Sequence, residues 1–449
     1  MENYMELNYI KFQDIDCVYY RKENSMIVIP KDEKESFNFL DVIKNKNFII
    51  EFTSTIYKKT YAYVKNVSFT GDRAIRFNIL YYAFLIQSET INEIQLTGDE
   101  IDMIFNPATY FFPKADNFKK NPVDLIYGKH IGEEYNIKYK GENISIVLSY
   151  GDILERGIAS DLKLHAKLSV LFEETNNIEK VHELITIVMK FIQLVSHQLE
   201  INLKPTAILG EIDGRRQKLG TYHNESYQLK RINAFSVIQY DYFKPYISQL
   251  LQFVADNENI NLNFYPKDIN ESYFYDIERF LAIFAAFENE CKEIPELYEK
   301  KVDDSPLLIK EDLLKVIKKL GDNDQISEDD RNFLYQAKSR ISQLGTQFGQ
   351  RKKIVNAYKQ NIHILEESMN FIFPKGFKIG KVASDLAELR NKIVHSNFYT
   401  VFDREERDII RFLEILTYVM LFKRIGIEDK GIDILIGVVF GCNTRHMQI

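Results

Sequence analysis

The chain of 449 residues contains no tryptophan and only three cysteines. Cys17, Cys291 and Cys442 lie far apart and form no CxxC pair. The sequence therefore lacks both the closely spaced ligands of a zinc site and the cysteine density of a disulfide framework. We expect three reduced thiols, most of them buried.

Long hydrophobic runs are also missing. The two longest apolar stretches are residues 178–198, which Glu183 and Lys190 interrupt, and residues 432–440. The second is far shorter than the roughly 20 residues that a membrane-spanning helix needs. Residues 1–4 have neither the basic nor the apolar region of a signal peptide. These observations predict a cytoplasmic protein without a membrane span.

The chain lacks the short motifs of common cofactor sites. It has no Walker loop and no GxGxxG, HExxH or GxSxG pattern, and its histidines form no recognisable pair of metal ligands. We therefore expect neither a metal ion nor a nucleotide cofactor. Positive charge is not in excess either, since 58 Lys and Arg against 65 Asp and Glu give a formal net charge of -7. This balance argues against a chain that coats nucleic acid along its length, but it is compatible with a local basic site.

Aromatic residues are plentiful, with 27 Tyr and 32 Phe, so the chain has ample material for packed cores. Its length predicts more than one domain, because single cores stop growing at about 250 to 300 residues. A segment at residues 257–268, which contains Pro266, is a plausible boundary. We expect a β-rich N-terminal region at residues 1–265 and a helical domain at residues 266–449. The predicted class is therefore α+β with several domains.

Residues rich in Ile, Val, Tyr, Phe and Thr alternate with turn residues in the first half of the chain. The clearest strand, residues 162–172, has apolar residues at every second position. Many antiparallel strands without regular helices between them predict a sandwich or an open barrel. The other expected strands are residues 48–53, 61–69, 75–86, 91–96 and 135–148. We expect helices at residues 178–198 and 237–255 to pack on this sheet.

The C-terminal region has the periodicity of a helix bundle. Ser327, followed by an acidic turn, resembles a capping box and predicts the start of a helix rather than a calcium loop. The expected helices are residues 275–291, 310–320, 328–344 with a possible extension to 358, 361–373, 381–396 and 405–424.

One of these helices carries the most informative motif, Arg390-Asn391-Lys392-Ile393-Val394-His395. Apolar residues precede it at spacings of four, three and four, which predicts that one side of the helix is buried. At about 100° per residue, Asn391 and His395 lie opposite this side, and Arg390 lies at its edge. The apolar stripe consists of Val382, Leu386, Leu389 and Ile393. We expect Ala383, Ala387 and Val394 to lie on the outer face, where a second helix packs closely.

The pair Arg390 and His395 is suited to RNA cleavage without a metal ion. A histidine with a pKa near 6.5 accepts the proton of a ribose 2′-OH at neutral pH, and the guanidinium stabilises the charge that develops on the phosphate. The expected products end in a 2′,3′-cyclic phosphate and a 5′-OH. Asn391 is placed to hydrogen-bond the imidazole or a phosphate. The alternative is an ordinary surface Arg and His.

Arg, a polar residue, three further residues and His form the motif of the HEPN superfamily, many of whose helical domains are metal-independent ribonucleases. This sequence resembles that superfamily over Arg390 to His395. Its domain order looks most like the ApeA-type HEPN proteins of anti-phage defence. The resemblance implies an endoribonuclease that acts by abortive infection, forms a homodimer or higher homo-oligomer and responds to a phage-derived trigger. The competing function is a non-catalytic HEPN module that dimerises or binds a partner.

Glu288 is a further candidate, because it stands at a position of the apolar stripe that we expect in the helix at residues 275–291. A buried acid needs a partner. HEPN domains often have an acidic residue in the first core helix, and the resemblance implies that Glu288 orients Arg390 or His395. The alternative is a structural acid bonded to the backbone or to an Arg of a neighbouring helix.

Basic residues are concentrated between residues 336 and 400, where eleven Lys and Arg face four Asp and Glu, a local charge of 11 - 4 = +7. We expect this excess to contact the phosphates of an RNA substrate. The candidate contact residues are Arg351, Lys352, Lys353 and Lys392. A solvated helix face is the alternative reading of such a run.

Overall fold

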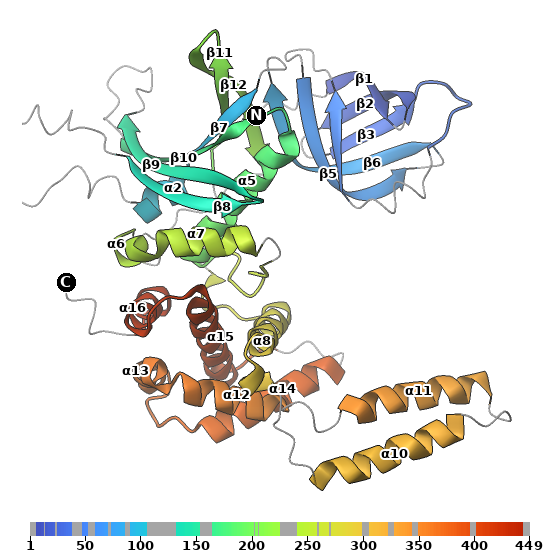
Figure 1. Ribbon diagram of the computed structural model, residues 1–449, viewed down its shortest axis with the longest axis vertical. Helices are drawn as coiled ribbons and strands as arrows, with labels where there is room; N and C mark the ends of the chain where they lie inside the picture. Colours follow the sequence, from blue (N-terminus) through green and yellow to red (C-terminus); the bar gives the residue numbers. More distant parts are fainter. Residues whose placement is uncertain are drawn as a thin grey trace, which may run out of the picture. The chain divides into compact units, whose positions relative to one another are not determined.

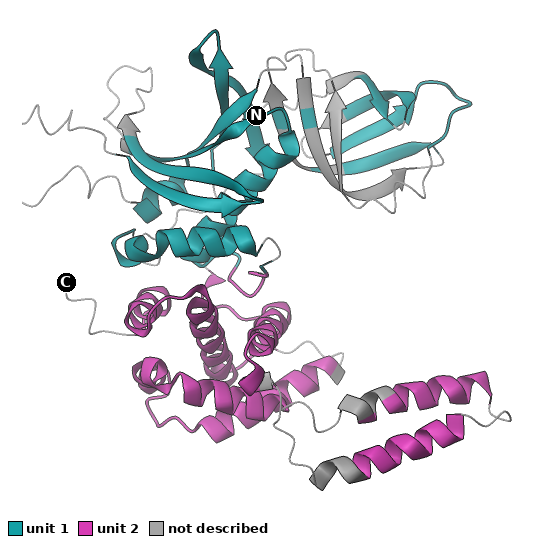
Figure 2. Cartoon of the chain, viewed as in Figure 1, with its two compact units in different colours: residues 1–260, 267–270 teal, residues 261–266, 271–449 magenta. Residues whose placement is uncertain are grey.

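The structure is a computed structural model that describes residues 6–12, 14–22, 25–37, 47–52, 59–70, 73–85, 90–105, 132–152, 164–201, 203–204, 206–224, 240–257, 260–268, 271–298, 305–321, 327–343, 349–395 and 401–442. It divides into two compact units (Figure 2). The first consists of residues 1–260 and 267–270, and the second of residues 261–266 and 271–449. Antiparallel strands dominate the first unit and helices make up the second, so the chain is of the α+β class.

The strands of the first unit pair in the order β1-β2-β3-β6-β12-β11-β7-β10-β9-β8, and β5 pairs with both β4 and β6 (Figure 1). The long strand β6 connects two groups of strands. Its first half pairs with β3 and its second half with β12, while β5 follows the other edge. The bounds are β1 Glu6–Phe12, β2 Ile15–Lys22, β3 Ser25–Pro30, β4 Asn47–Phe52, β5 Lys59–Thr70, β6 Ala74–Leu85, β7 Ile91–Leu96, β8 Glu133–Tyr139, β9 Glu142–Asp152, β10 Leu164–Thr175, β11 Thr206–Ile212 and β12 Arg215–Asn224.

The structure confirms the strand predicted at residues 162–172 from residue 164 on, as part of β10, whereas residues 162–163 lie outside the described residues. It divides the predicted stretch 135–148 into two strands at Lys140 and Gly141, which the sequence already marks as turn residues. That stretch is a hairpin of β8 and β9. Both turn residues have positive φ, 49° and 87°, which matches the right-handed twist of the flanking strands. Strands β1, β2, β3, β11 and β12 were not anticipated from the sequence.

Helices pack on the sheet of the first unit, as predicted. Helix α5, Ile178–Ser196, contacts β10, and α7, Ile247–Asp256, contacts β8. The side chain of Asn177 accepts a hydrogen bond from the backbone N–H of Glu179 and caps α5. Three shorter helices complete the unit: α2 Asp99–Phe105, α6 Tyr240–Phe243 and the 3-10 helix η3 Lys244–Tyr246. The predicted start at residue 237 lies outside the described residues.

The second unit is built around α15, Arg404–Ile425. This helix is buried on nearly all sides between Ile409 and Phe422, as expected of a helix in the centre of a bundle. It contacts α8, α13, α14 and α16. Asp403 and Glu406 form a capping box at its start, and Gly426, with φ of 93°, ends it. The other helices are α8 Ile277–Lys292, α9 Pro295–Tyr298, α10 Ser305–Gly321, α11 Glu328–Gln343, α12 Gln350–Gln360, α13 Ile362–Ile372, α14 Ile379–His395 and α16 Asp429–Phe440.

Several sequence predictions have a direct outcome in this fold. The hydroxyl of Ser327 accepts a 3.2 Å hydrogen bond from the backbone N–H of Asp330, which confirms the predicted helix start. Helix α11 does not extend to residue 358, because α12 begins separately after Gly349. All three cysteines are free and buried, as expected. None of the helices in the described ranges has an apolar stretch long enough to cross a membrane.

Candidate functional site

The motif with Arg390 and His395 lies at the C-terminal end of α14. The apolar stripe before it is buried as predicted, with Val382, Leu386 and Leu389 exposed by 6%, 0% and 5%. Two helices contact α14 on this side, α12 and α15. The local sequence forms a helix because its apolar residues recur at the period of one, and the bundle buries that side.

The motif residues themselves face outward to different degrees. Asn391 and Lys392 are exposed, and Arg390 is half-buried at the edge of the stripe. Among the side chains that the structure describes, Arg390 makes no hydrogen bond or ion pair. His395 is the last residue of α14. Its backbone is described, but its side chain lies outside the described part of the chain.

The outer face of α14, on which we expected Ala383, Ala387 and Val394, carries fewer accessible small residues than the sequence predicted. Ala383 is fully buried, Ala387 is half-buried and Val394 is 49% exposed. The expectation that Ala383 lies on the outer face is therefore wrong. Because both α12 and α15 contact α14, the buried arc is wider than the stripe that one neighbour would cover. Only Ala387 and Val394 remain accessible beside the motif.

Glu288 does not occupy the core position that we expected. It is half-buried, whereas Glu290, two residues later, is 9% exposed. The buried side of α8 is centred on its phenylalanines, such as Phe280 and Phe287, which rotates the stripe away from Glu288. In the described part of the chain, Glu288 makes no hydrogen bond or ion pair with Arg390.

Glu290 has the partner that a buried acid requires. Arg424, near the end of α15, donates from Nε to Glu290 Oε2 at 2.8 Å and from Nη2 to Oε1 at 2.7 Å. This two-pronged pair fixes the C-terminal part of α8 against that of α15. The alternative of a structural acid bonded to an Arg of a neighbouring helix is thus realised, but by Glu290 rather than by Glu288.

The predicted basic surface is present only in part. Arg351 and Lys352 are exposed at the start of α12, but Lys353 is only 5% exposed. Burial raises the pKa of the Cys291 thiol to about 12, and the nearby positive charge of Lys353 partly offsets this effect. Lys353 therefore lies inside the bundle near α8 and is unsuited to contact a ligand at the surface.

Arg351 lies near the beginning of α14. Its Nη2 atom is 4.0 Å from the point where a Cβ on Gly380 would stand. Arg390 follows Gly380 by ten residues, which is about 15 Å along a helix at 1.5 Å per residue. Arg351 is thus exposed near the beginning of α14, next to Lys352, and Lys392 is exposed within the motif.

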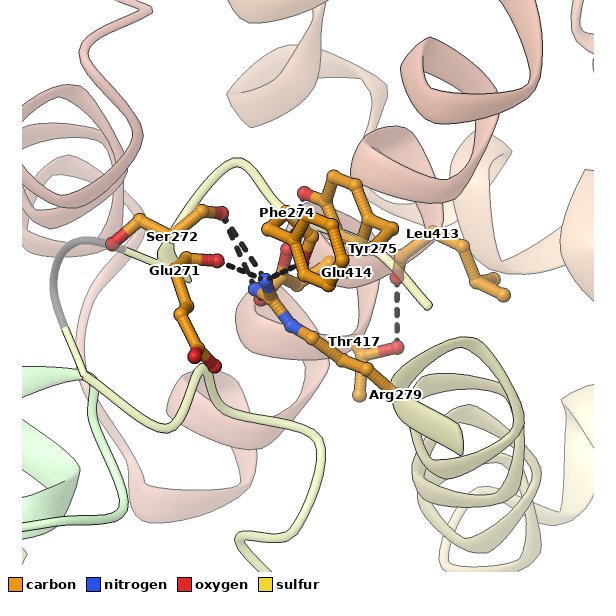
Figure 3. A network of polar contacts seen from close by, with 8 residues as sticks. All are labelled: Glu271, Ser272, Phe274, Tyr275, Arg279, Leu413, Glu414 and Thr417. Atoms are coloured by element: carbon orange, nitrogen blue, oxygen red, sulfur yellow. Dashed lines mark hydrogen bonds and ion pairs between the residues drawn. The ribbon is translucent and has the colours of Figure 1, made fainter. Parts of the chain in front are cut away.

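A buried polar network, which the sequence reading missed, lies at the start of α8 (Figure 3). The Glu414 carboxylate, fully buried in α15, accepts from Arg279 Nη2 at 2.7 Å and from the Tyr275 hydroxyl at 2.7 Å. Arg279 also donates to the backbone carbonyls of Glu271 and Phe274. The sequence signal was available, because Glu414 interrupts an apolar run in α15. The network fixes the segment that enters α8 against the central helix.

The phenol of Tyr275 stays protonated in this network. Burial raises its pKa well above the ordinary value, and the negative charge of Glu414 adds to the effect. The Arg279 guanidinium also lies over the Tyr275 ring, 4.5 Å from its centroid. Its hydrogen bonds connect α8 to the buried acid of α15, so this cluster stabilises the bundle.

The first unit contains a second polar cluster, between β8 and the helices that follow β12. Glu133 accepts hydrogen bonds from Tyr135 at 2.8 Å, from Lys244 at 2.7 Å and from Tyr240. Burial opposes the ionised form, but the hydrogen bonds from Lys244 and Tyr240 hold the pKa of Glu133 below its usual value. These contacts attach β8 to α6 and η3.

Comparisons of this chain with protein families, with curated proteins and with solved structures return no match. Within the described ranges, no three His, Cys, Asp or Glu side chains gather as the ligands of a metal ion would. The functional assignment therefore depends on the residues of α14 and on their surroundings.

Proposed function

We propose that the helical unit is a metal-independent endoribonuclease of the HEPN type, with Arg390 and His395 as its catalytic residues. The observation that carries this proposal is the position of the motif on α14. Arg390 and Asn391 stand outside the buried stripe formed by Val382, Leu386 and Leu389, and Arg390 has no partner among the described side chains. A guanidinium at the edge of a buried stripe has the charge and the forked donors that a phosphate requires.

The chemistry follows from the two side chains. His395 accepts the proton of a ribose 2′-OH, and the 2′ oxygen forms a bond to the adjacent phosphorus. Arg390 stabilises the negative charge on the phosphoryl oxygens. The bond from phosphorus to the 5′ oxygen breaks, and the leaving oxygen takes up a proton. The products carry a 2′,3′-cyclic phosphate and a 5′-OH, and Asn391 positions the imidazole or the phosphate.

Two copies of the chain form the site in this proposal. Arg390 and His395 are five residues apart, so their directions from the helix axis differ by roughly 140° at 100° per residue. Two α14 helices that face each other across a two-fold axis bring the Arg of one copy towards the His of the other. The accessible residues Ala387 and Val394 are small enough for close approach at this face.

The exposed basic residues supply the phosphate contacts of the substrate. Arg351 lies beside the beginning of α14, Lys352 is its neighbour in α12, and Lys392 lies within the motif, so each offers an exposed positive charge to a phosphate of the substrate. Lys353 is left out of this set because it is buried.

The antiparallel β unit is the regulatory part of the protein in this proposal, with the architecture of a sandwich or an open barrel. A two-unit chain of this order fits the ApeA-type HEPN proteins, in which the biological role is abortive infection. In that role, a phage-derived trigger acts on the β unit and releases the ribonuclease.

RNA cleavage by purified variants tests the proposal. His395→Ala and Arg390→Ala should each lower the cleavage rate by about 10²- to 10⁴-fold, the usual contribution of one general base or charge stabiliser. Glu366→Ala is the control, since Glu366 is an exposed residue of α13, away from the proposed catalytic face of α14. Expression of wild type and His395→Ala in cells gives a second readout, because only the wild type should be toxic. Two folded variants that cut RNA at the wild-type rate would exclude the assignment and favour the non-catalytic module.

A further inference from the structure

Helices α10 and α11 form a helical hairpin in the second unit, in which the two helices lie side by side (Figure 1). Helix α10 contacts α11 through one of its sides, where Leu314 and Ile317 are half-buried. Helix α11 uses Leu334, Ala337 and Ile341, which recur at spacings of three and four. The contact between the two helices is therefore an ordinary packing of two amphipathic faces.

A second apolar stripe of α10 is not covered by α11. Ile309, Leu313, Val316 and Leu320 are exposed by 70%, 46%, 54% and 49%. They recur at spacings of four, three and four, which places them on one side of the helix over about 17 Å. At 100° per residue, this side is about 100° away from the one that contacts α11. Four aligned apolar side chains on one exposed helix face are typical of a docking surface.

We propose that this stripe of α10 pairs with the same stripe of a second copy of the chain, with the two α10 helices antiparallel. The spacing of the stripe is that of the a and d positions of a coiled coil. Around a two-fold axis between residues 314 and 315, Ile309 packs against the partner's Leu320, and Leu313 packs against the partner's Val316. Each apolar residue thus meets another one, and the contact closes on itself without leaving a free end.

The charges beside the stripe select this partner and this direction. Asp312 and Lys319 both lie along the edge of the stripe that faces away from α11, at 70° to 90° from its centre by the same 100° rule. In the antiparallel pair, Asp312 of one copy faces the partner's Lys319, and the symmetry repeats this ion pair once more. The exposed contact of Asp312 with Lys315 at 3.4 Å leaves Asp312 accessible, because both side chains are more than 70% exposed.

A parallel pair lacks this complementarity. There, the edge with Asp312 and Lys319 faces the opposite edge of the partner, which α11 covers and where Ile317 stands. Asp312 would meet an apolar side chain instead of a lysine. The antiparallel arrangement is therefore the one in which both the apolar and the charged residues of α10 are matched.

Analytical ultracentrifugation of the full chain over a range of concentrations tests the pairing, without use of the proposed activity. The wild type should self-associate, and Leu313→Lys should weaken the association at least about tenfold, because it places a charge in the centre of the stripe. Glu311→Lys introduces the same side chain on the far side of α10 and is the matched control. It should leave both the association and the thermal stability unchanged.

A charge exchange tests the direction of the pair. Asp312→Lys and Lys319→Asp should each weaken the association by creating like-charge contacts, and the double variant should restore it to within about threefold of the wild type. Lys315→Ala controls for the contact that Asp312 makes within its own helix. A wild type that stays monomeric at about 100 µM, an unchanged association in Leu313→Lys, or a double variant as weak as the single ones would overturn the inference.

The same measurement separates this surface from the one proposed at α14. An association that Ala387→Arg weakens and Leu313→Lys does not would place the contact at α14. That result would overturn the pairing of α10 and leave the proposed ribonuclease function intact.

Discussion

Glu414 and Arg279 are 135 positions apart in the sequence, and their side chains form an ion pair of 2.7 Å in the interior of the helical unit. The carboxylate is fully buried, and its second oxygen accepts the hydroxyl of Tyr275. Because α8 carries the arginine and α15 the acid, this pair fixes the register between the first helix of the bundle and its central helix.

Removing the acid of this pair should destabilise the helical unit. Glu414→Ala leaves the Arg279 guanidinium buried without its counter-charge, and such a change costs about 3 to 5 kcal/mol of the free energy of unfolding. Urea denaturation followed by circular dichroism measures the loss. Glu405→Ala, an exposed acid on the same helix, should change the stability by less than about 1 kcal/mol. A loss for Glu414→Ala as small as that of the control would contradict a structural role for the pair.

Two adjacent lysines of α12 should respond differently to the same substitution. Lys352 is exposed, so Lys352→Ala should weaken RNA binding several-fold, more strongly at low salt, and leave the unfolding transition unchanged. Lys353 is buried, and Lys353→Ala should lower the free energy of unfolding by about 1 to 3 kcal/mol. Filter binding at two salt concentrations and thermal melts separate the two effects. Equal effects of both variants on binding would contradict this division.

The stability of the β unit should fall in mild acid because of His182 on α5. This imidazole contacts the Tyr222 hydroxyl at 2.9 Å, and burial lowers its pKa to about 4. Between pH 6.5 and 4, the unfolded chain binds a proton that the folded chain does not, so the stability decreases as the pH falls through this window. The loss amounts to about 2 kcal/mol at pH 5 and vanishes above pH 7. The urea midpoint of the wild type should be lower at pH 5 than at pH 7.5, and this difference should be smaller in His182→Gln. A difference as large in the variant as in the wild type would rule out His182 as the source of the pH dependence.

The proposed mechanism makes the substrate's own 2′-OH the nucleophile. An RNA with a single 2′-deoxy or 2′-O-methyl residue on the 5′ side of the cut should therefore bind but resist cleavage, and cleavage of the unmodified RNA should continue in EDTA. Analysis of the product ends should find 2′,3′-cyclic phosphate. Activity that EDTA abolishes, that a divalent ion restores and that ignores the 2′ position would mean that Arg390 and His395 are misassigned.

Several features of this protein followed from local sequence patterns. The alternation of residues 162–172 predicted the strand that is β10 from residue 164 on, and the spacing of Val382, Leu386 and Leu389 identified both α14 and its buried side. Ser327 marked the start of α11. These features are local, because the period of the side chains follows from the backbone geometry of a strand or a helix and the cap from a hydrogen bond within one turn.

Other features were decided only where distant segments meet. Ala383 is buried because both α12 and α15 contact α14, and periodicity in one helix does not reveal how many neighbours it has. The buried acid of α8 is Glu290 rather than Glu288. The phenylalanines of α8 define the buried side of this helix, and Arg424 of α15 forms the ion pair with Glu290. The sequence by itself thus determined which residues share a face, since that depends on the backbone alone. The tertiary structure determined what each face meets, since burial and ion pairing depend on residues of other helices, such as Arg424, 134 positions after Glu290.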